Sequence, residues 1–323
     1  MRKNPVFQSK HFVLNSLTSR IFAAIAIDGG SAICNSGVID LGGKILVFDT
    51  FLTPQAATDL REIAKKIFGR IPQIIINSHY HNDHIWGNQV FASNAHIISS
   101  SQTRALIETE GAEELKWYVS NSAQRLESIL AQSPGTDNEK QEQLLWRGEY
   151  EGIVEALPLL SVCMPDITFD NHLEIHGANG TARLTTFEHS HTKSDTILHL
   201  PEEGIIFMSD LLFVGCHPYL ADGDPFQLLK TLKDISQFQA TQFIPGHGPV
   251  GTGTDILLMI EYIELIIEIA RTLGEDLDKN EAKIKEMKIP RRFLHWKIPT
   301  FWQSNIRFLF ERLNSKRGDH QGG

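Results

Sequence analysis

His79-Tyr80-His81-Asn82-Asp83-His84 is the stretch that decides how this chain is interpreted. It places three imidazoles and a carboxylate within six residues, although the whole chain has only 14 histidines among 323 residues. The apolar, β-branched run at residues 72–77 comes just before it and predicts a short buried strand. The histidines therefore fall on the loop at the carboxyl end of a strand, where the ligand sites of open α/β sheets collect.

The order of these side chains indicates a use for them. If the loop is extended, His79 and His81 point the same way, because side chains alternate with a period of two. Asp83 and His84 then turn toward a neighbouring point, an arrangement that suits two adjacent metal ions rather than one. The alternative is a helix cap with surface histidines, which would not explain why ligand residue types cluster so closely.

Composition and charge exclude several function classes. Hydrophobic residues make up 41% of the chain and charged residues 21%, as in an ordinary globular protein. The net charge of −9 argues against a dedicated nucleic-acid binder, which usually carries a basic face. Cys34, Cys163 and Cys216 are few, odd in number and far apart, so we expect reduced thiols in a cytosolic protein.

No segment of the sequence predicts export or membrane insertion. The basic residues near the N-terminus are not followed by an uninterrupted apolar run, so we predict no signal peptide. The longest apolar stretch, residues 256–270, is interrupted by three glutamates and does not predict a membrane span. We therefore expect a soluble, cytoplasmic protein that has no nucleic-acid or membrane partner.

The chain alternates strand and helix patterns on both sides of a helical segment. Residues 12–50 predict strands joined by tight turns, with Asp28-Gly29-Gly30 as a hairpin signal. Residues from about 101 to 158 predict a helical insertion that covers one edge of the core, as a structural cover rather than a lid. Strand patterns return from residue 167, and the tail is helical. We therefore predict a main domain over residues 1–252, with a C-terminal helical extension over residues 253–323 packed on it.

Basic and aromatic residues are interleaved between residues 291 and 312. Such a combination can indicate RNA binding, but at this net charge helix packing or a dimer surface explains it better. We predict that the C-terminal helices pair two copies in a homodimer, which a monomeric mass by light scattering would rule out.

Three later motifs place further candidate ligands at the ends of strands. The run Glu188-His189-Ser190-His191-Thr192 puts histidines on the loop before the next strand pattern. Asp210 lies where the apolar strand beginning at residue 204 stops. His247 lies between two glycines in Pro245-Gly246-His247-Gly248-Pro249, so the backbone can turn tightly and present the imidazole.

Together, and in this order, these motifs resemble the metallo-β-lactamase-fold hydrolase superfamily. The resemblance covers residues from about 10 to 252 and rests on the His-x-His-x-Asp-His run, the His-Thr loop, the strand-terminal Asp and the Pro-Gly-His-Gly-Pro motif. It implies an α+β fold, an αββα sandwich with the site at one edge of the two sheets. The helical insertion and the helical C-terminal extension would be additions to that sandwich.

The resemblance also implies a set of ligands for two metal ions. The first ion would be held by His79, His81 and His191, the second by Asp83, His84 and His247, and Asp210 would bridge both. His191 is preferred over His189 because the family's histidine is followed by a small hydroxyl residue, as His191 is by Thr192; His189 would then orient a ligand. Imidazoles with a few carboxylates favour zinc, with iron or manganese also possible choices, and Cys216 is a weaker candidate ligand.

The chemistry that the resemblance implies is hydrolysis. Two metal ions would hold a bridging hydroxide whose pKa is brought toward neutrality, and Asp83 could also orient this nucleophile. We therefore expect cleavage of an ester, lactone, thioester or amide, β-lactams included, in a small organic molecule. Two rival functions are a phosphodiesterase or nuclease of the same fold, whose relatives usually add a basic channel, and a non-catalytic metal-stabilised binding or regulatory protein. Because all seven ligand positions are filled, the non-catalytic function is disfavoured.

The loop of residues 215–225 is the most individual part of the sequence. Lactonases of this family tend to place Tyr three residues after the bridging Asp, where this chain has Phe213. His217 or Tyr219 could replace that tyrosine by donating a hydrogen bond to the substrate's oxyanion. Ordinary turn chemistry explains both residues equally well at this stage.

Overall fold

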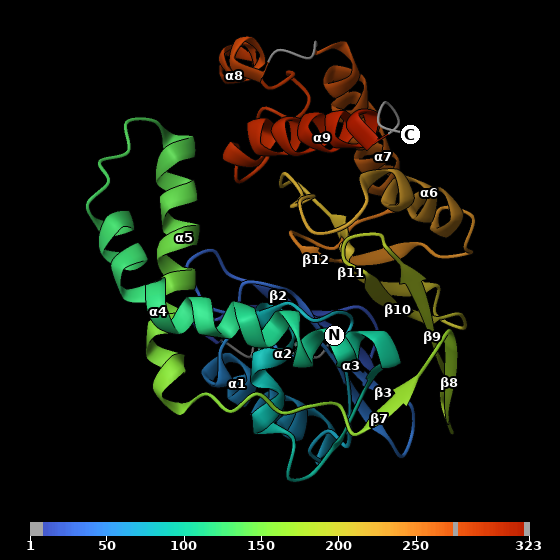
Figure 1. Ribbon diagram of the computed structural model, residues 1–323. Coiled ribbons are helices and arrows are strands. Elements are labelled where there is room, and N and C mark those ends of the chain that lie inside the picture. The colour runs from blue at the N-terminus through green and yellow to red at the C-terminus, as the bar shows by residue number, and fades with distance from the viewer. Residues whose placement is uncertain (1–8, 274–276, 320–323) are drawn as a thin grey trace.

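Two β-sheets pack face to face in the computed structural model, which describes residues 9–273 and 277–319 (Figure 1). The first sheet has seven strands in the order in which they occur in the chain. They are β1 (Phe12–Ser16), β2 (Ile21–Ala26), β3 (Ser36–Asp40), β4 (Ile45–Phe48), β5 (Ile74–Ile76), β6 (His96–Ser100) and β7 (Ile167–Phe169). Strands β1 to β4 are antiparallel and β4 to β7 are parallel, so the carboxyl ends of β4, β5 and β6 lie at one edge.

The second sheet has five strands in the order β12-β11-β10-β9-β8. They are β8 (His172–Gly177), β9 (Gly180–Glu188), β10 (Ser194–Leu200), β11 (Ile205–Phe213) and β12 (Gln242–His247). Neighbours are antiparallel except β11 and β12, which run parallel and therefore end on the same side. All nine residues of β11 are buried, as its nearly continuous apolar sequence predicts.

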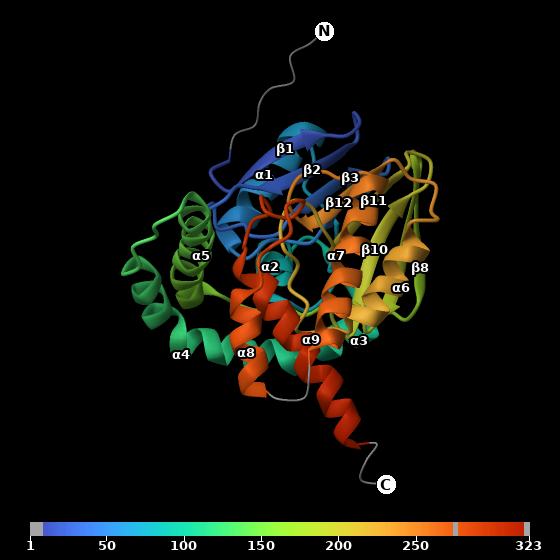
Figure 2. The ribbon, with the colours of Figure 1, turned by 90° about the horizontal axis from the view of Figure 1, so that it is seen from above.

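The helices cover the outer faces of the sheets and form two further groups beside the sandwich (Figures 1 and 2). They are α1 (Pro54–Phe68), α2 (Asn82–Ile85), α3 (Ser101–Glu108), α4 (Glu110–Leu130), α5 (Asp137–Ala156), α6 (Pro225–Ile235), α7 (Gly253–Thr272), α8 (Leu277–Glu286) and α9 (Thr300–Asp319), with two short 3₁₀ helices at Trp86–Val90 and Leu157–Leu159. Helix α1 buries one apolar side against the first sheet, while α6, α7 and α9 share an apolar cluster with β11. The predicted α+β fold, an αββα sandwich with a helical insertion and extension, is confirmed.

The core between the sheets is made of aliphatic and aromatic side chains from both inner faces. Phe48 of β4 and Phe207 of β11 meet there with ring centroids 5.9 Å apart. Ile39, Leu46 and Leu198 are fully buried in the same cluster. Burial of this apolar area holds the two sheets in a fixed relative position, and with them the loops at their edge.

The connection between β2 and β3 differs from the predicted hairpin. A turn does form at Asp28-Gly29, where the N–H of Gly30 donates to the carbonyl of Ile27, but it is part of a longer loop of residues 27–35 on which α5 rests. A Cβ atom at Gly148 of α5 would lie 2.3 Å from the Cα atom of Gly29, so the helix crosses the loop at very close range. The glycines that suggested a hairpin therefore serve a backbone contact with the insertion.

Helices α4 and α5 stand on one side of the sandwich, and α7, α8 and α9 gather beside the second sheet (Figure 1). Among the helices that the structure describes, none combines the length and the apolar character that a membrane crossing requires.

Candidate metal centre

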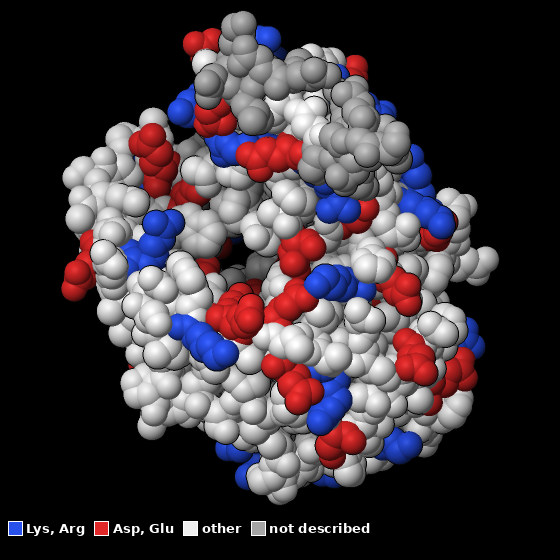
Figure 3. Space-filling model, in the orientation of Figure 1, with Lys and Arg blue, Asp and Glu red and all other residues white. Residues whose placement is uncertain are grey.

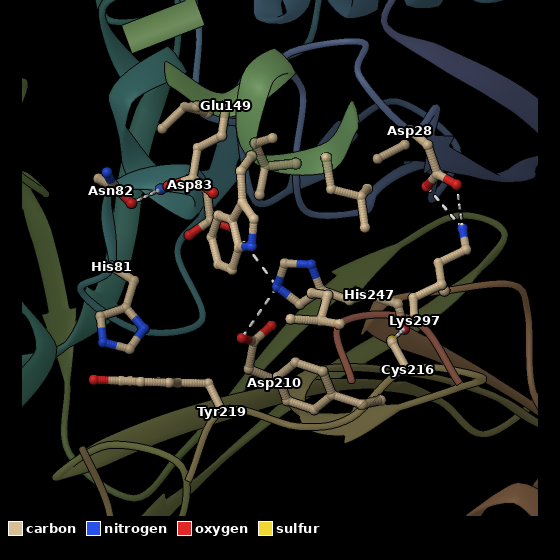
Figure 4. Close-up of a pocket in the computed structure, with 18 of the residues that line it drawn as sticks. Asp28, His81, Asn82, Asp83, Glu149, Asp210, Cys216, Tyr219, His247 and Lys297 are labelled. Carbon is tan, nitrogen blue, oxygen red and sulfur yellow. Dashed lines mark hydrogen bonds and ion pairs between the residues drawn. The ribbon is translucent and has the colours of Figure 1, made fainter. Parts of the chain in front are cut away.

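The edge where the strands end carries all seven predicted ligand side chains. His79 and His81 follow β5, and the short helix α2 then carries Asp83 and His84. The remaining three come from the second sheet: His191 from the β9–β10 loop, Asp210 from within β11 and His247 from the end of β12. Several of them are drawn in Figure 4, where Asp83, Asp210 and His247 converge. The site is therefore assembled from both sheets.

Three imidazoles and one carboxylate form the first group. Nε2 of His79 lies 3.0 Å from Nδ1 of His81, and Nε2 of His191 lies 3.2 Å from that same Nδ1 atom. Oδ2 of Asp210 is 3.3 Å from Nε2 of His191. Burial lowers the pKa of His79 and lowers that of His191 to about 4, which favours the neutral imidazole that binds metal ions.

The second group shares Asp210 with the first. Oδ1 of Asp210 lies 3.3 Å from Nε2 of His84, and Oδ2 lies 3.3 Å from Nε2 of His247. Oδ2 of Asp83 is 3.5 Å from His84 and 3.6 Å from His247. Although burial alone would raise the pKa of Asp210, the surrounding histidines hold it well below its usual range. Asp210 is therefore an ionised carboxylate whose Oδ2 lies near both His191 of the first group and His247 of the second, while its Oδ1 faces His84 of the second group.

The spacing of these atoms fits metal ligands better than hydrogen-bond partners. Ligand atoms at about 2.0–2.1 Å from a tetrahedral zinc ion lie about 3.3 Å apart, close to the separations seen here. Nε2 of His84 and Oδ1 of Asp210 are also buried with no hydrogen-bond partner among the described residues. Because a buried polar atom without a partner is costly, these two atoms indicate a site for a cation between them. The chemistry of the donors, imidazole and carboxylate, fits a divalent ion.

Asp49 is a functional residue that the sequence reasoning missed. It follows β4 at a left-handed backbone position and accepts hydrogen bonds from the backbone N–H and the hydroxyl of Ser78 and from the hydroxyl of Ser209. Its Oδ2 lies 2.8 Å from Nδ1 of His84. That contact leaves Nε2 of His84 free to face the candidate metal site. The available signal was an acidic residue directly after a buried strand, at the same sheet edge as the histidine loop.

Two further aspartates hold the histidine loops. Asp195 accepts hydrogen bonds from the backbone N–H groups of His191 and Thr192, and from the Thr192 hydroxyl, which fixes the β9–β10 loop. Asp222 lies 3.1 Å from Nε2 of His81, so that ring presents Nδ1 to the first group. Although burial opposes it, the hydrogen bond from Asp222 helps to raise the pKa of His81 to about 9.

Glycines allow β12 to pass beside the centre. A Cβ atom at Gly246 would lie 1.7 Å from Oδ1 of Asp210, so any other residue would displace the carboxylate. Gly248 has a φ of 99°, which permits the sharp turn after His247. The tight turn predicted beside His247 is therefore found at Gly248, whereas Gly246 allows β12 to approach Asp210 closely.

A cavity of about 630 Å³ opens beside the metal centre. Its inner end is lined by Asp83, His191, Asp210 and His247, and its outer part lies under α5 and the segment before α9. The space-filling view shows the molecule hollowed between the α4–α5 side and the C-terminal helices (Figure 3). A volume of this size suits a small organic ligand.

The two predicted oxyanion donors lie in different places. Tyr219 lines the cavity, with its ring 6.4 Å from that of His81 (Figure 4). His217 is fully buried outside the cavity lining, where its Nδ1 lies 3.0 Å from the Tyr262 hydroxyl and its ring packs against Trp296. This position does not support the predicted contact between His217 and substrate, and it assigns His217 to the packing of the C-terminal helices.

His189 and Cys216 are less suited to bind metal than the seven clustered side chains. His189 is exposed on its turn, whereas His191 lies in the cluster, as preferred. Cys216 lines the cavity, but it belongs to none of the clusters of candidate ligand atoms found among the described residues.

Comparison with known proteins places this geometry in a family. The sequence model described as Metallo-beta-lactamase superfamily matches residues 29–247. A metallo-beta-lactamase from Pontibacter korlensis is 14% identical with a TM-score of 0.56, over 78% of this chain and 99% of that one. A metallo beta lactamase from Erythrobacter litoralis, with beta mercaptoethanol in its active site, is also 14% identical, with a TM-score of 0.57 over 80% of this chain and 99% of that one. No curated protein gives a significant match.

Proposed function

We propose, from the premise that this chain belongs to the metallo-β-lactamase superfamily, that it is a dinuclear metal-dependent hydrolase. Its substrate would be an ester, lactone, thioester or amide of a small organic molecule, β-lactams included. The observation that carries this proposal is the position of Asp210. Its Oδ1 faces His84 while its Oδ2 faces His191 and His247, as expected of a carboxylate shared by two ions.

The chain's own residues have separable roles in this proposal. When bound, two divalent ions, zinc first among them, would lower the pKa of a water molecule and polarise the carbonyl of the substrate. Asp83 lies on the cavity side between His84 and His247, where its carboxylate would accept a hydrogen bond from the attacking water. Asp49 and Asp222 would keep their histidines oriented.

Tyr219 is the donor that we propose for the developing oxyanion. It lines the cavity beside His81, and burial raises the pKa of its hydroxyl, so the group stays protonated at neutral pH. A protonated phenol donates a hydrogen bond and would stabilise negative charge on the substrate's oxygen.

The charge of the cavity wall favours this class of substrate over a phosphodiester. Among the described residues that line the cavity, Lys297 is the only lysine or arginine. Its ammonium lies 2.7 Å from the carboxylate of Asp28, so its charge is already compensated. A nucleic acid or phosphodiester would be expected to need free positive charge along such a wall.

The first experiment measures metal content beside activity. Protein purified without chelator should contain about two divalent ions per chain by elemental analysis, and His81→Ala and Asp210→Ala should each lose metal. The same preparations are then screened with p-nitrophenyl esters, lactones, a β-lactam and bis(p-nitrophenyl) phosphate. If the folded protein contained no metal and cleaved none of these compounds, the result would favour the alternative that it is a non-catalytic binding protein. Cleavage of the phosphodiester alone would favour the phosphodiesterase.

We also propose a cytoplasmic location and a homodimer. Cys34, Cys163 and Cys216 are all free thiols, which supports a reducing compartment. Light scattering on the purified protein tests the dimer, and a monomeric mass would contradict it.

A further inference from the structure

The outer part of the cavity differs in chemistry from the metal centre. Three segments that are distant in the sequence build its wall: the end of β2 with the loop after it, the helices α4 and α5, and the segment that leads into α9. Their contributions are mainly aliphatic and aromatic: Ile25, Ile27, Tyr118, Trp146, Ile298 and Phe301. This wall is continuous with the metal centre, so a molecule bound at the ions would reach it.

Contacts between the rings hold the wall in shape. The ring of Trp146 lies 5.9 Å from that of Phe301, and Phe301 lies 5.7 Å from Tyr219. The indole N–H of Trp146 donates to the carboxylate of Glu142, 3.1 Å away. The polar edge of the indole is therefore satisfied within the helix, and the rest of the ring is available to an apolar ligand.

The charges in the wall disfavour an anionic ligand at this position. Lys297 is paired with Asp28 and adds no free positive charge. Glu114 of α4 and Glu149 of α5 lie in the same wall, toward the metal centre. Both add a carboxyl group and no positive charge to this wall, so a negative charge placed there would be desolvated without compensation.

We propose that the substrate is a neutral acyl compound whose acyl group is apolar and extended, and that Phe301 and Trp146 determine this specificity. The inference rests on the proposed function, because the metal centre would hold the scissile carbonyl. The acyl group would lie under α5 and the start of α9, with the carbonyl at the inner end of the cavity. Burying apolar surface of the substrate then provides the affinity, and its length sets the preference.

A series of p-nitrophenyl esters tests the preference. The leaving group is the same in the acetate, butyrate and octanoate, so differences in kcat/KM report the acyl group. We expect kcat/KM to rise by as much as about three- to fourfold for each methylene that enters the cavity. Equal or higher kcat/KM for the acetate would overturn the inference while leaving the proposed hydrolase intact.

Matched variants localise the effect. Phe301→Ala should lower kcat/KM for the octanoate about tenfold more than for the acetate, since it removes contact with a few methylenes. Phe308 lies two turns along the same helix, is partly buried and is outside the cavity lining. Phe308→Ala should therefore leave the ratio of kcat/KM for the octanoate to that for the acetate unchanged. Ile27→Ser repeats the test from the opposite wall, where the side chain is 37% exposed and its loss should not prevent folding. An unchanged ratio in both wall variants would contradict the assignment.

Binding without hydrolysis separates this inference from the proposed function. Octan-2-one is neutral and has no bond that a hydrolase cleaves, and calorimetry compares it with acetone on the protein as purified. We expect binding of octan-2-one but not of acetone, weakened about tenfold by Phe301→Ala. Binding with no ester hydrolysis would refute the hydrolase and keep the apolar site. Hydrolysis with no binding of octan-2-one would refute the apolar site and keep the hydrolase.

Discussion

The metal centre and the outer wall of the same cavity are built in contrasting ways. The candidate ligands at the centre lie on loops after strands, on the short helix α2 and within β11, and several are fixed by a second partner, as His84 is by Asp49. The wall comes from the α4–α5 insertion and from residues such as Phe301 that lie beyond the family match at 247. Ring contacts there do not impose the directional requirements of metal ligands. In the proposed function the two regions could therefore vary separately, since the centre would set the reaction and the wall would set the substrate.

The largest effect is expected when one histidine of the metal centre, His191, is removed. His191→Ala should lose metal from the first group and lower kcat at least about a thousandfold, because metal ions contribute several kcal/mol to the transition state. His189→Ala, only two residues away and exposed, should keep both the metal content and kcat. Elemental analysis and steady-state kinetics check both. If His189→Ala were the variant that lost metal, the ligand assignment would be reversed.

A smaller effect is expected for Asp49, which contacts a candidate ligand, His84, rather than a metal ion. Asp49→Asn would present an amide N–H toward Nδ1 of His84 in place of an accepting oxygen, which disturbs the orientation of that ring. We expect metal affinity to fall about 10- to 100-fold, measured by competition with a chelating dye. Asp170→Asn, on the exposed surface after β7, serves as the control. Equal affinities in both variants would show that Asp49 does not support the centre.

The smallest expected effect lies where the two regions meet, at Glu149. Burial, with the charge of Asp83 nearby, raises its pKa from an ordinary value of 4.5 to about 8. Between these values the folded protein holds the proton more tightly than the unfolded chain, so the free energy of unfolding falls as pH rises through this window. Glu149→Gln should remove this loss and be more stable than the parent above pH 8, by about 1–2 kcal/mol after allowing for partial exposure.

Urea unfolding of chelator-treated protein from pH 4.5 to pH 9 measures this difference. Glu155→Gln, exposed and about two turns further along α5, should follow the parent at every pH. If the free energies of unfolding of Glu149→Gln and the parent changed in parallel with pH, the pKa of Glu149 would not be raised by its position.

The centre was largely predictable from sequence, because most of its candidate ligands lie in short motifs near the ends of recognisable strands. Asp210 was placed wrongly at the end of its strand: β11 continues to Phe213, so this residue lies within it. His79, His81 and His247 needed only a strand pattern followed by a loop.

The positions of Asp49 and Asp195 beside the histidines were not recognised from sequence. A single acidic residue without a motif looks like an ordinary turn residue until the fold brings it to the same sheet edge as a histidine. Second partners depend on tertiary position, and spacing along the chain does not encode that position.

The outer part of the molecule was predicted less well, for a related reason. For His217 the sequence left a substrate contact and ordinary turn chemistry equally open, because its environment is set by Tyr262 and Trp296, which lie more than forty residues further along the chain. The glycines at 29 and 30 were interpreted as a hairpin signal, and the close contact of Gly29 with Gly148 of the distant insertion could not be inferred from the local sequence. Local patterns predict elements reliably where neighbours in space are also neighbours in sequence, and these contacts are not of that kind.

The candidate metal ligands come from both sheets: His79 to His84 follow β5, Asp210 and His247 belong to the second sheet, and His191 lies on the loop between two of its strands. Metal ions bound here would therefore cross-link the two sheets of the sandwich. Ligands that bind only the folded state stabilise it by mass action, by about 2.7 kcal/mol at a hundred times the dissociation constant. The melting temperature of this protein would then depend on how much free metal surrounds it, and a shortage of metal would limit its lifetime as well as its activity.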